Sequence, residues 1–206
     1  MRFKRDEWDK FYDGHHWTSA MLANLPNILT LFRIAVIPLV AGAFFLEKPT
    51  ASWVAAALFL VAGITDYLDG YVARTFRSTT AFGRFLDPVA DKLLISSVLL
   101  LLAGYGRIDG ISLIPALIIL CREILVSGLR EFLAGLSLSL PVTKLAKWKT
   151  LLQMFALGFL LWDEPFPDYI TLKPLALAGL WGAAFLTLVT GYDYLKKSLK
   201  HMNDTP

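Results

Sequence analysis

Residues 52–104 read SWVAAALFLVAGITDYLDGYVARTFRSTTAFGRFLDPVADKLLISSVLLLLAG, two apolar runs joined by a polar segment that carries four aspartates. Each run is close to the length of about 20 residues that a helix needs to cross a bilayer. Asp66 and Asp69 lie near the end of the first run, and Asp87 and Asp91 near the start of the second. Charged groups within membrane helices are costly and usually functional. The stretch therefore predicts two antiparallel helices with chemistry at their shared end.

The composition of the whole chain argues against an ordinary water-soluble domain. Its 206 residues are 56% hydrophobic and only 18% charged, and the mean hydropathy is +0.55. A soluble protein of this size could not bury that much apolar surface, so a membrane is the expected solvent. Cys121 is the one cysteine, which excludes an intrachain disulfide, and its apolar neighbours favour packing over a nucleophilic role.

Apolar segments along the chain predict an all-α, polytopic membrane protein with six transmembrane helices. The expected spans are Ile28–Leu46, Ser52–Ala73, Phe85–Gly104, Ile111–Leu133, Lys149–Trp162 with its flanks, and Leu175–Leu195. Residues 1–25 mix aromatic and charged side chains and are expected to form an interfacial amphipathic helix, with a disordered, weakly anchored tail as the alternative. The chain would then divide into this juxtamembrane segment and one six-helix domain over residues 26–206.

The distribution of positive charge predicts the orientation. With the N-terminus in the cytoplasm, sixteen of the 20 Lys and Arg residues fall on the cytoplasmic side, and only Lys48, Arg107 and Lys173 fall outside. An excess of this kind is typical of cytoplasmic loops. Both termini and the four aspartates are therefore expected at the cytoplasmic face.

The spacing of the aspartates has a geometric consequence. Asp66 and Asp69 are three residues apart, and Asp87 and Asp91 are four apart, so each pair shares one face of its helix. Two antiparallel helices would gather all four carboxylates. Such a cluster needs positive charge to stay ionised in a low-dielectric site, and oxygen ligands favour Mg²⁺, Mn²⁺ or Ca²⁺ over zinc. The cluster predicts one or two divalent cations that handle phosphate.

Two other interpretations of the cluster stay open at this point. The aspartates could hold the helices together through salt bridges with Arg74 and Arg77, or they could belong to an ion pathway. An ion pathway would place acidic groups near mid-bilayer, whereas these are expected at one interface. Small residues near them, Gly70, Ala73 and Gly83, leave room for a ligand to approach the backbone, which favours a binding site.

The acidic stretch also matches a known signature at every fixed position. It resembles the signature of the CDP-alcohol phosphotransferase family, membrane enzymes that move a substituted phosphate group from a CDP-linked donor to an alcohol. In this chain the signature reads Asp66-x2-Asp69-Gly70-x2-Ala73-Arg74-x8-Gly83-x3-Asp87-x3-Asp91.

The resemblance implies a mechanism and a set of roles. Asp66, Asp69 and Asp87 would bind two divalent metal ions, Mg²⁺ or Mn²⁺, and Asp91 would contact a metal while acting as the general base. The acceptor hydroxyl would attack the phosphorus that bears the lipid, and CMP would leave. The residues that would line the CDP pocket are Gly70, Ala73, Arg74 and Gly83.

Polar residues elsewhere bear on the two substrates. Asn27, Thr30 and Arg33 lie three residues apart in the first span and could face the headgroup site together, the first two toward the donor and Arg33 toward the acceptor phosphate. Asn27 could equally be a helix N-cap, and Arg33 needs a carboxylate or phosphate partner, or must snorkel. Basic residues at the cytoplasmic ends of the fourth and fifth spans suggest a phosphorylated acceptor, with anchoring to anionic lipids as the alternative. They are Arg122, Arg130, Lys147 and Lys149.

Secondary motifs point to one branch of the family. The Arg-Glu pairs at 122–123 and 130–131, the stretch Lys147-x-Lys149-Thr150-x2-Gln153 and the segment 191–194 resemble bacterial phosphatidylglycerophosphate synthases. This resemblance implies a protein of the bacterial inner membrane that contacts membrane lipids. It also suggests a homodimer, and no nucleic-acid partner is expected. It would convert CDP-diacylglycerol and sn-glycerol 3-phosphate to phosphatidylglycerophosphate and CMP. Siblings that accept phosphatidylglycerol, inositol phosphate or serine are the alternative, and a non-catalytic ion carrier is a remote one.

Overall fold

The computed structural model describes residues 27–76, 81–135, 144–162 and 172–203. Within these ranges, the backbone but not the side chains is described at residues 69–76, 81–82, 84, 144, 197 and 199–203. The expected interfacial helix over residues 1–25 lies outside the described residues, so it stays a prediction.

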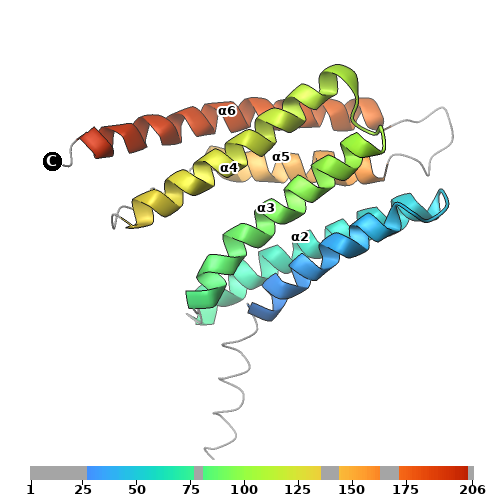
Figure 1. The fold of residues 1–206 in the computed structure, drawn as a ribbon, viewed down its shortest axis with the longest axis horizontal. Helices are drawn as coiled ribbons and strands as arrows, with labels where there is room; N and C mark the ends of the chain where they lie inside the picture. Colours follow the sequence, from blue (N-terminus) through green and yellow to red (C-terminus); the bar gives the residue numbers. More distant parts are fainter. Residues whose placement is uncertain (1–26, 77–80, 136–143, 163–171, 204–206) are drawn as a thin grey trace, which may run out of the picture.

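Helices make up nearly all of the described chain, which confirms the expected all-α class (Figure 1). The first described helix runs over Asn27–Ala43. It is followed by α2 (Thr50–Phe76), α3 (Ala81–Gly104), a 3-10 turn η1 (Gly110–Ser112), α4 (Leu113–Gly135), α5 (Lys144–Leu161) and α6 (Lys173–Asn203). Each of the six expected spans overlaps one of these six α-helices. In a bilayer this is the expected result, because a helix satisfies its own backbone hydrogen bonds.

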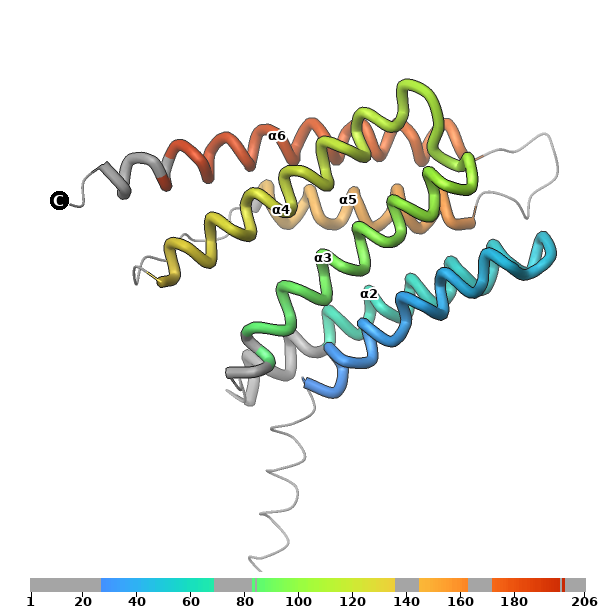
Figure 2. Tube along the Cα trace, in the orientation of Figure 1, coloured from blue at the N-terminus to red at the C-terminus, as the bar shows by residue number. Residues whose placement is uncertain are grey.

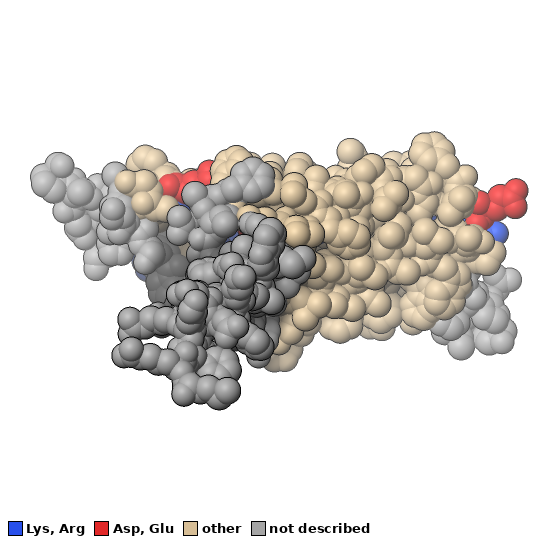
Figure 3. Space-filling model, turned by 90° about the horizontal axis from the view of Figure 1, so that it is seen from below, with Lys and Arg blue, Asp and Glu red and all other residues tan. Residues whose placement is uncertain are grey.

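Three stretches of described helix are long and apolar enough to cross a membrane, namely Thr50–Leu68, Gly110–Gly135 and Lys173–Lys196. The Asn27–Ala43 helix is apolar but shorter. Figure 3 shows a face on which the described charged side chains gather toward the two ends of the molecule, with a broad uncharged band between them. A band of this kind suits the hydrocarbon core of a bilayer, and the chain is an integral membrane protein.

Close helix packing builds the half of the bundle formed by α4, α5 and α6. α6 packs along both α4 and α5, and α5 also contacts α2 and α3. Small residues allow the close approach of α5 and α6: a Cβ added at Gly182 would lie 3.1 Å from Leu152 Cδ2, and one at Gly179 would lie 3.3 Å from Ala156 Cβ. Small residues at such interfaces are how membrane helices pack without a hydrophobic driving force.

A buried arginine ties together the end of the bundle that holds the 44–49 and 105–112 turns. Arg107 is 8% exposed. Its guanidinium donates to the carbonyl oxygens of Leu160 and Leu161 at the end of α5, and to Ser52 Oγ at the start of α2 at 2.7 Å. It also lies 5.2 Å from the centre of the Phe44 ring. These contacts satisfy carbonyls that the last turn of α5 leaves without helical donors.

The opposite end of the bundle collects the residues singled out from the sequence. The beginning of α3 and the ends of α4 and α6 lie toward this end in Figures 1 and 2. The polar pairs described below join the Asn27–Ala43 helix, α2 and α3 on one side, and α4, α5 and α6 on the other.

Candidate functional site

An acidic group forms one wall of the site. One carboxylate oxygen from each of Asp66, Asp87 and Asp91 lies within 4.8 Å of the other two. Asp66 comes from α2, and Asp87 and Asp91 come from successive turns of α3, so the expected i, i+4 face is formed. The three side chains are 45%, 45% and 50% exposed, and Asp66 and Asp91 line the cavity described below.

Arg33 lies against this acidic group. It is fully buried in the Asn27–Ala43 helix and forms ion pairs with Asp66 (2.9 Å), Asp87 (3.3 Å) and Asp91. Thr30, one turn earlier, has its hydroxyl 3.5 Å from an oxygen of Asp87. The expected internal partner of Arg33 is thus a set of carboxylates. Its expected contact with the acceptor phosphate, and the donor-binding roles of Thr30 and Asn27, stay predictions.

Other members of the acidic signature are only partly described. Asp69, Gly70, Ala73 and Arg74 lie in the helical backbone of α2, and their side chains are outside the described residues. Gly83 lies in the first turn of α3 and is half-buried. The expected roles of these residues in metal and CDP binding therefore stay predictions.

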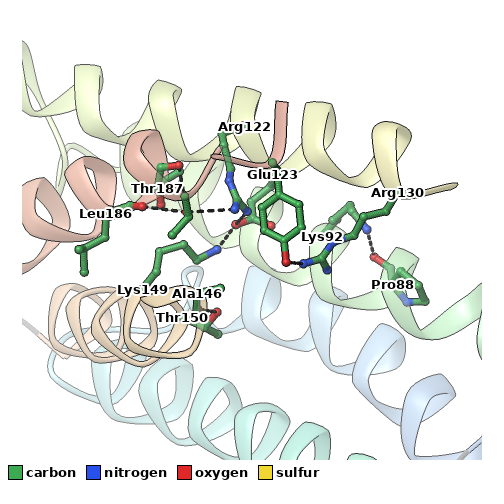
Figure 4. A network of polar contacts seen from close by, with 12 residues as sticks. Pro88, Lys92, Arg122, Glu123, Arg130, Ala146, Lys149, Thr150, Leu186 and Thr187 are labelled. Carbon is green, nitrogen blue, oxygen red and sulfur yellow. Dashed lines mark hydrogen bonds and ion pairs between the residues drawn. The ribbon is translucent and has the colours of Figure 1, made fainter. Parts of the chain in front are cut away.

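A basic group forms the opposite wall (Figure 4). Lys149 of α5 is 5% exposed and forms an ion pair with Glu123 of α4. Arg122, 9% exposed, lies 3.4 Å from the same carboxylate and donates to Thr190 Oγ1 of α6 at 3.1 Å. Two buried cations thus share one carboxylate, and the group of Arg122, Glu123 and Lys149 has a formal charge of +1. Burial without full neutralisation is costly unless a further anion binds.

Arg130 continues the basic wall toward the end of α4. Its guanidinium donates to the hydroxyl of Tyr194 on α6 at 2.7 Å and lies 4.8 Å from the centre of that ring. The arginine is itself exposed, as is Lys147 on α5. Tyr194 therefore holds the guanidinium in place while leaving other donors available to a ligand.

A cavity of about 1010 Å³ lies between the two walls. Seven of the residues predicted to act on metals or substrates line it, and two of them are Arg33 and Lys147. The other five are Asp66, Asp91, Arg122, Arg130 and Lys149. Ala62, Gly63, Leu94, Ile95 and Val126 supply an apolar lining. A volume of this order suits a nucleotide or a lipid headgroup more readily than a single ion.

Several residues around the cavity were given no individual role at the site in the sequence-based prediction. Glu123 and Tyr194 hold the cations, and Gly191 makes room for one of them: a Cβ at Gly191 would lie 3.1 Å from Arg122 Cγ and 3.5 Å from its Nε. Lys92 of α3 also lines the cavity. The signal that could have revealed Gly191 and Tyr194 is their helical spacing of three residues, which places both on one face of α6.

The acidic group has the chemistry of a divalent metal site. Three carboxylates face one guanidinium, so the described part of the cluster has an excess of negative charge. Each carboxylate has a second oxygen in addition to the one that meets Arg33. Oxygen-only ligands suit Mg²⁺ or Mn²⁺. The residues present therefore fit a divalent cation, and Asp69 belongs to the same turn of α2.

Comparison with known proteins identifies the family. A family model described as CDP-alcohol phosphatidyltransferase matches residues 23–189. A protein of Rickettsia bellii named CDP-diacylglycerol–glycerol-3-phosphate 3-phosphatidyltransferase is 49% identical over 86% of this chain and 97% of its own length. Proteins of the same name from Cereibacter sphaeroides and Haemophilus influenzae are 38% and 41% identical, over 88% and 85% of this chain and 98% and 94% of their own lengths. The chain belongs to the CDP-alcohol phosphatidyltransferase family.

Proposed function

We propose that this protein transfers a phosphatidyl group from CDP-diacylglycerol to sn-glycerol 3-phosphate, releasing CMP and forming phosphatidylglycerophosphate. The observation that supports this function most strongly is that one cavity is lined both by carboxylates from α2 and α3 and by buried cations from α4 and α5. The carboxylates suit the metal ions that bind a diphosphate, and the cations suit a second phosphate group. The relatives named above carry the same activity in their names.

The acidic wall would take the donor. Asp66, Asp69 and Asp87, with Asp91, would hold two divalent ions, Mg²⁺ or Mn²⁺. When bound, such ions neutralise diphosphate oxygens and the charge that develops on departing CMP. The small residues Gly70, Ala73 and Gly83 would let the nucleotide approach the helices, with Arg74, Asn27 and Thr30 as further donor contacts. Arg33 orients the three described carboxylates through its ion pairs.

The basic wall would take the acceptor. Arg122 and Lys149 are buried beside the cavity and carry one more positive charge than Glu123 cancels. Arg130 and Lys147 would add positive charge nearer the cavity mouth, and Arg33, which also lines the cavity, would contact the acceptor phosphate from the acidic wall. A phosphate monoester would be held by charge-assisted hydrogen bonds, which are stronger than neutral ones. This arrangement would place the acceptor hydroxyl toward the carboxylates.

Asp91 would serve as the general base. Its carboxylate lies in the acidic group and lines the cavity. It would take the proton from the acceptor hydroxyl as that oxygen bonds to the phosphorus bearing diacylglycerol. The bond from this phosphorus to the bridging oxygen would break, and CMP would leave with that oxygen. Positioning and charge neutralisation supply most of the catalysis in such transfers.

Acceptor choice tests the proposal directly. Purified protein in detergent is supplied with CDP-diacylglycerol, Mg²⁺ or Mn²⁺, and one alcohol at a time: glycerol 3-phosphate, phosphatidylglycerol, inositol phosphate or serine. We expect CMP release with glycerol 3-phosphate. Release only with another alcohol would assign the protein to a sibling activity, and no release with any alcohol would favour a non-catalytic protein.

We further infer that the six α-helices cross the bacterial inner membrane. Both termini and the cavity would be on the cytoplasmic side, and residues 1–25 would lie on the membrane surface. The excess of Lys and Arg at the cavity end supports this orientation. Single cysteines at Lys48 and Lys147 in a Cys121→Ser background test it. In intact cells, an impermeant thiol reagent should label position 48 from outside and leave position 147 unlabelled; the reverse pattern would invert the topology. A homodimer stays a prediction, and cross-linking in membranes would test it.

A further inference from the structure

A buried amide on α5 lines the cavity without a hydrogen-bond partner for its oxygen. Gln153 is 3% exposed, and no donor in the described part of the chain reaches its Oε1. The residue lies one helical turn beyond Lys149, about 6 Å further along the axis of α5. It contributes to the cavity surface together with Lys149 and Arg122.

Arg122 presents a second unsatisfied atom in the same cavity wall. Its two terminal nitrogens meet Glu123 and Thr190, while its buried Nε has no partner among the described residues. Both residues line the cavity, and each has one buried polar atom without a partner among the described residues: the amide oxygen of Gln153 and the Nε of Arg122, which lies on the side of Gly191. Buried polar atoms are normally paired, so each such exception calls for a ligand or water. Leaving one unpaired costs more than an average hydrogen bond contributes.

The chemistry of the two side chains indicates which ligand they would bind. The Arg122 guanidinium, beside the Lys149 ammonium at the cavity surface, suits a phosphate oxygen. An amide oxygen suits a hydroxyl, since a phosphate monoester dianion has no proton to donate. The complementary ligand is a phosphate monoester with a free hydroxyl close to the phosphate. An acceptor alcohol needs one hydroxyl for attack, so the hydroxyl bound at Gln153 is a second one.

We propose that Gln153 is a specificity-determining residue that accepts a hydrogen bond from the non-reacting hydroxyl of the acceptor. This proposal rests on the function proposed above and goes further, because it assigns recognition of the C2 hydroxyl of glycerol 3-phosphate to one side chain. A site built to bond a hydroxyl rejects an analogue that lacks it, since the buried protein atom is then left unpaired.

The test compares two acceptors that differ by this hydroxyl. Glycerol 3-phosphate and 3-hydroxypropyl phosphate both have a primary hydroxyl and a phosphate, and only the first has a hydroxyl between them. CMP release gives kcat/KM for each acceptor at saturating CDP-diacylglycerol. The ratio of the two values is independent of the fraction of active enzyme, so partial misfolding of a variant does not distort it.

The ratio is compared between the wild type and three variants. The wild type should prefer glycerol 3-phosphate by about tenfold or more. Gln153→Met, of similar size but without the oxygen, should bring the ratio close to one, mainly through the KM of glycerol 3-phosphate. Gln153→Glu keeps an acceptor oxygen and should keep the preference for glycerol 3-phosphate, although its negative charge should weaken the binding of both phosphorylated acceptors. Leu157→Met, one turn further in the apolar core of α5, should leave the ratio unchanged.

The outcomes separate the two proposals. A wild type that turns over glycerol 3-phosphate without preferring it, or a Gln153→Met variant that retains the full preference, would overturn the role of Gln153 alone. A wild type that releases no CMP with glycerol 3-phosphate would overturn the proposed function, and this inference with it. If Gln153→Met shows no measurable turnover with either acceptor, Gln153→Ala is measured in its place, and the same ratio decides.

Discussion

Replacement of Lys149 by methionine tests the basic wall most directly. The side chain is 5% exposed and ion-paired with Glu123. The substitution keeps most of the apolar stem and removes the ammonium, so the formal charge of the group of Arg122, Glu123 and Lys149 falls from +1 to 0. We expect weaker binding of the acceptor phosphate, with the donor site on the opposite wall unaffected.

The size of the effect follows from the contact that is lost. A hydrogen bond between charged groups contributes about 1.5–3 kcal/mol. At about 1.4 kcal/mol for each factor of ten, the KM for glycerol 3-phosphate should rise about 10- to 150-fold. The change in kcat should be smaller, because this contact is made to the acceptor phosphate before and during reaction. The KM for CDP-diacylglycerol should stay close to the wild-type value.

The assay is CMP release in detergent micelles, with glycerol 3-phosphate varied at saturating donor and metal. Lys196→Met is the matched control, because Lys196 is exposed on α6 and does not line the cavity. The double variant Glu123→Gln/Lys149→Met restores the group's formal charge to +1 and should recover part of the lost affinity. An unchanged KM in Lys149→Met, or an equal rise in Lys196→Met, would refute the assignment of Lys149 to the acceptor phosphate.

The other expectations concern the acidic wall, the packing around Arg122 and the far end of the bundle. Asp91→Asn should lower kcat about 10²- to 10⁴-fold, as expected for loss of a general base, while donor binding in a filter assay persists. Asp66→Asn should instead weaken Mn²⁺ binding measured by electron paramagnetic resonance; wild-type affinity would contradict its ligand role. Gly191→Ala places a Cβ 3.1 Å from Arg122 Cγ and should raise the KM for glycerol 3-phosphate several-fold without loss of folded protein. Arg107→Met removes donors from two carbonyls and a hydroxyl and should destabilise the protein by about 2–5 kcal/mol, seen as a lower midpoint of thermal unfolding in detergent; an unchanged midpoint would remove it from the structural contacts.

The helices were predictable because their signal is local. Long apolar runs in lipid must satisfy their backbone internally, so each run becomes a helix wherever it is placed. Boundaries were less predictable: α5 begins at Lys144, before the expected start at Lys149, and α6 continues to Asn203, beyond Leu195. Charged residues end an apolar pattern without ending a helix, since Lys and Arg are good helix formers.

Part of the site was predictable for the same reason. Asp87 and Asp91 share a helix face because of their spacing, and the relative placement of α2 and α3 brings them close to Asp66. The basic wall was anticipated only as a set of cations on the same side of the membrane. The arrangement of these cations depends on Glu123, which the sequence analysis included in a motif without giving it a role in binding them.

The sequence by itself determined the class, the family signature and the side of the bundle on which charge collects, because these depend on periodicity and on positions a few residues apart. Tertiary structure alone decided the pairings between distant segments. Arg33 meets Asp91, 58 positions later, and Arg130 meets Tyr194, 64 positions later. Such contacts depend on how whole helices pack, and helix packing is set by the combined shape of many side chains that no local pattern specifies.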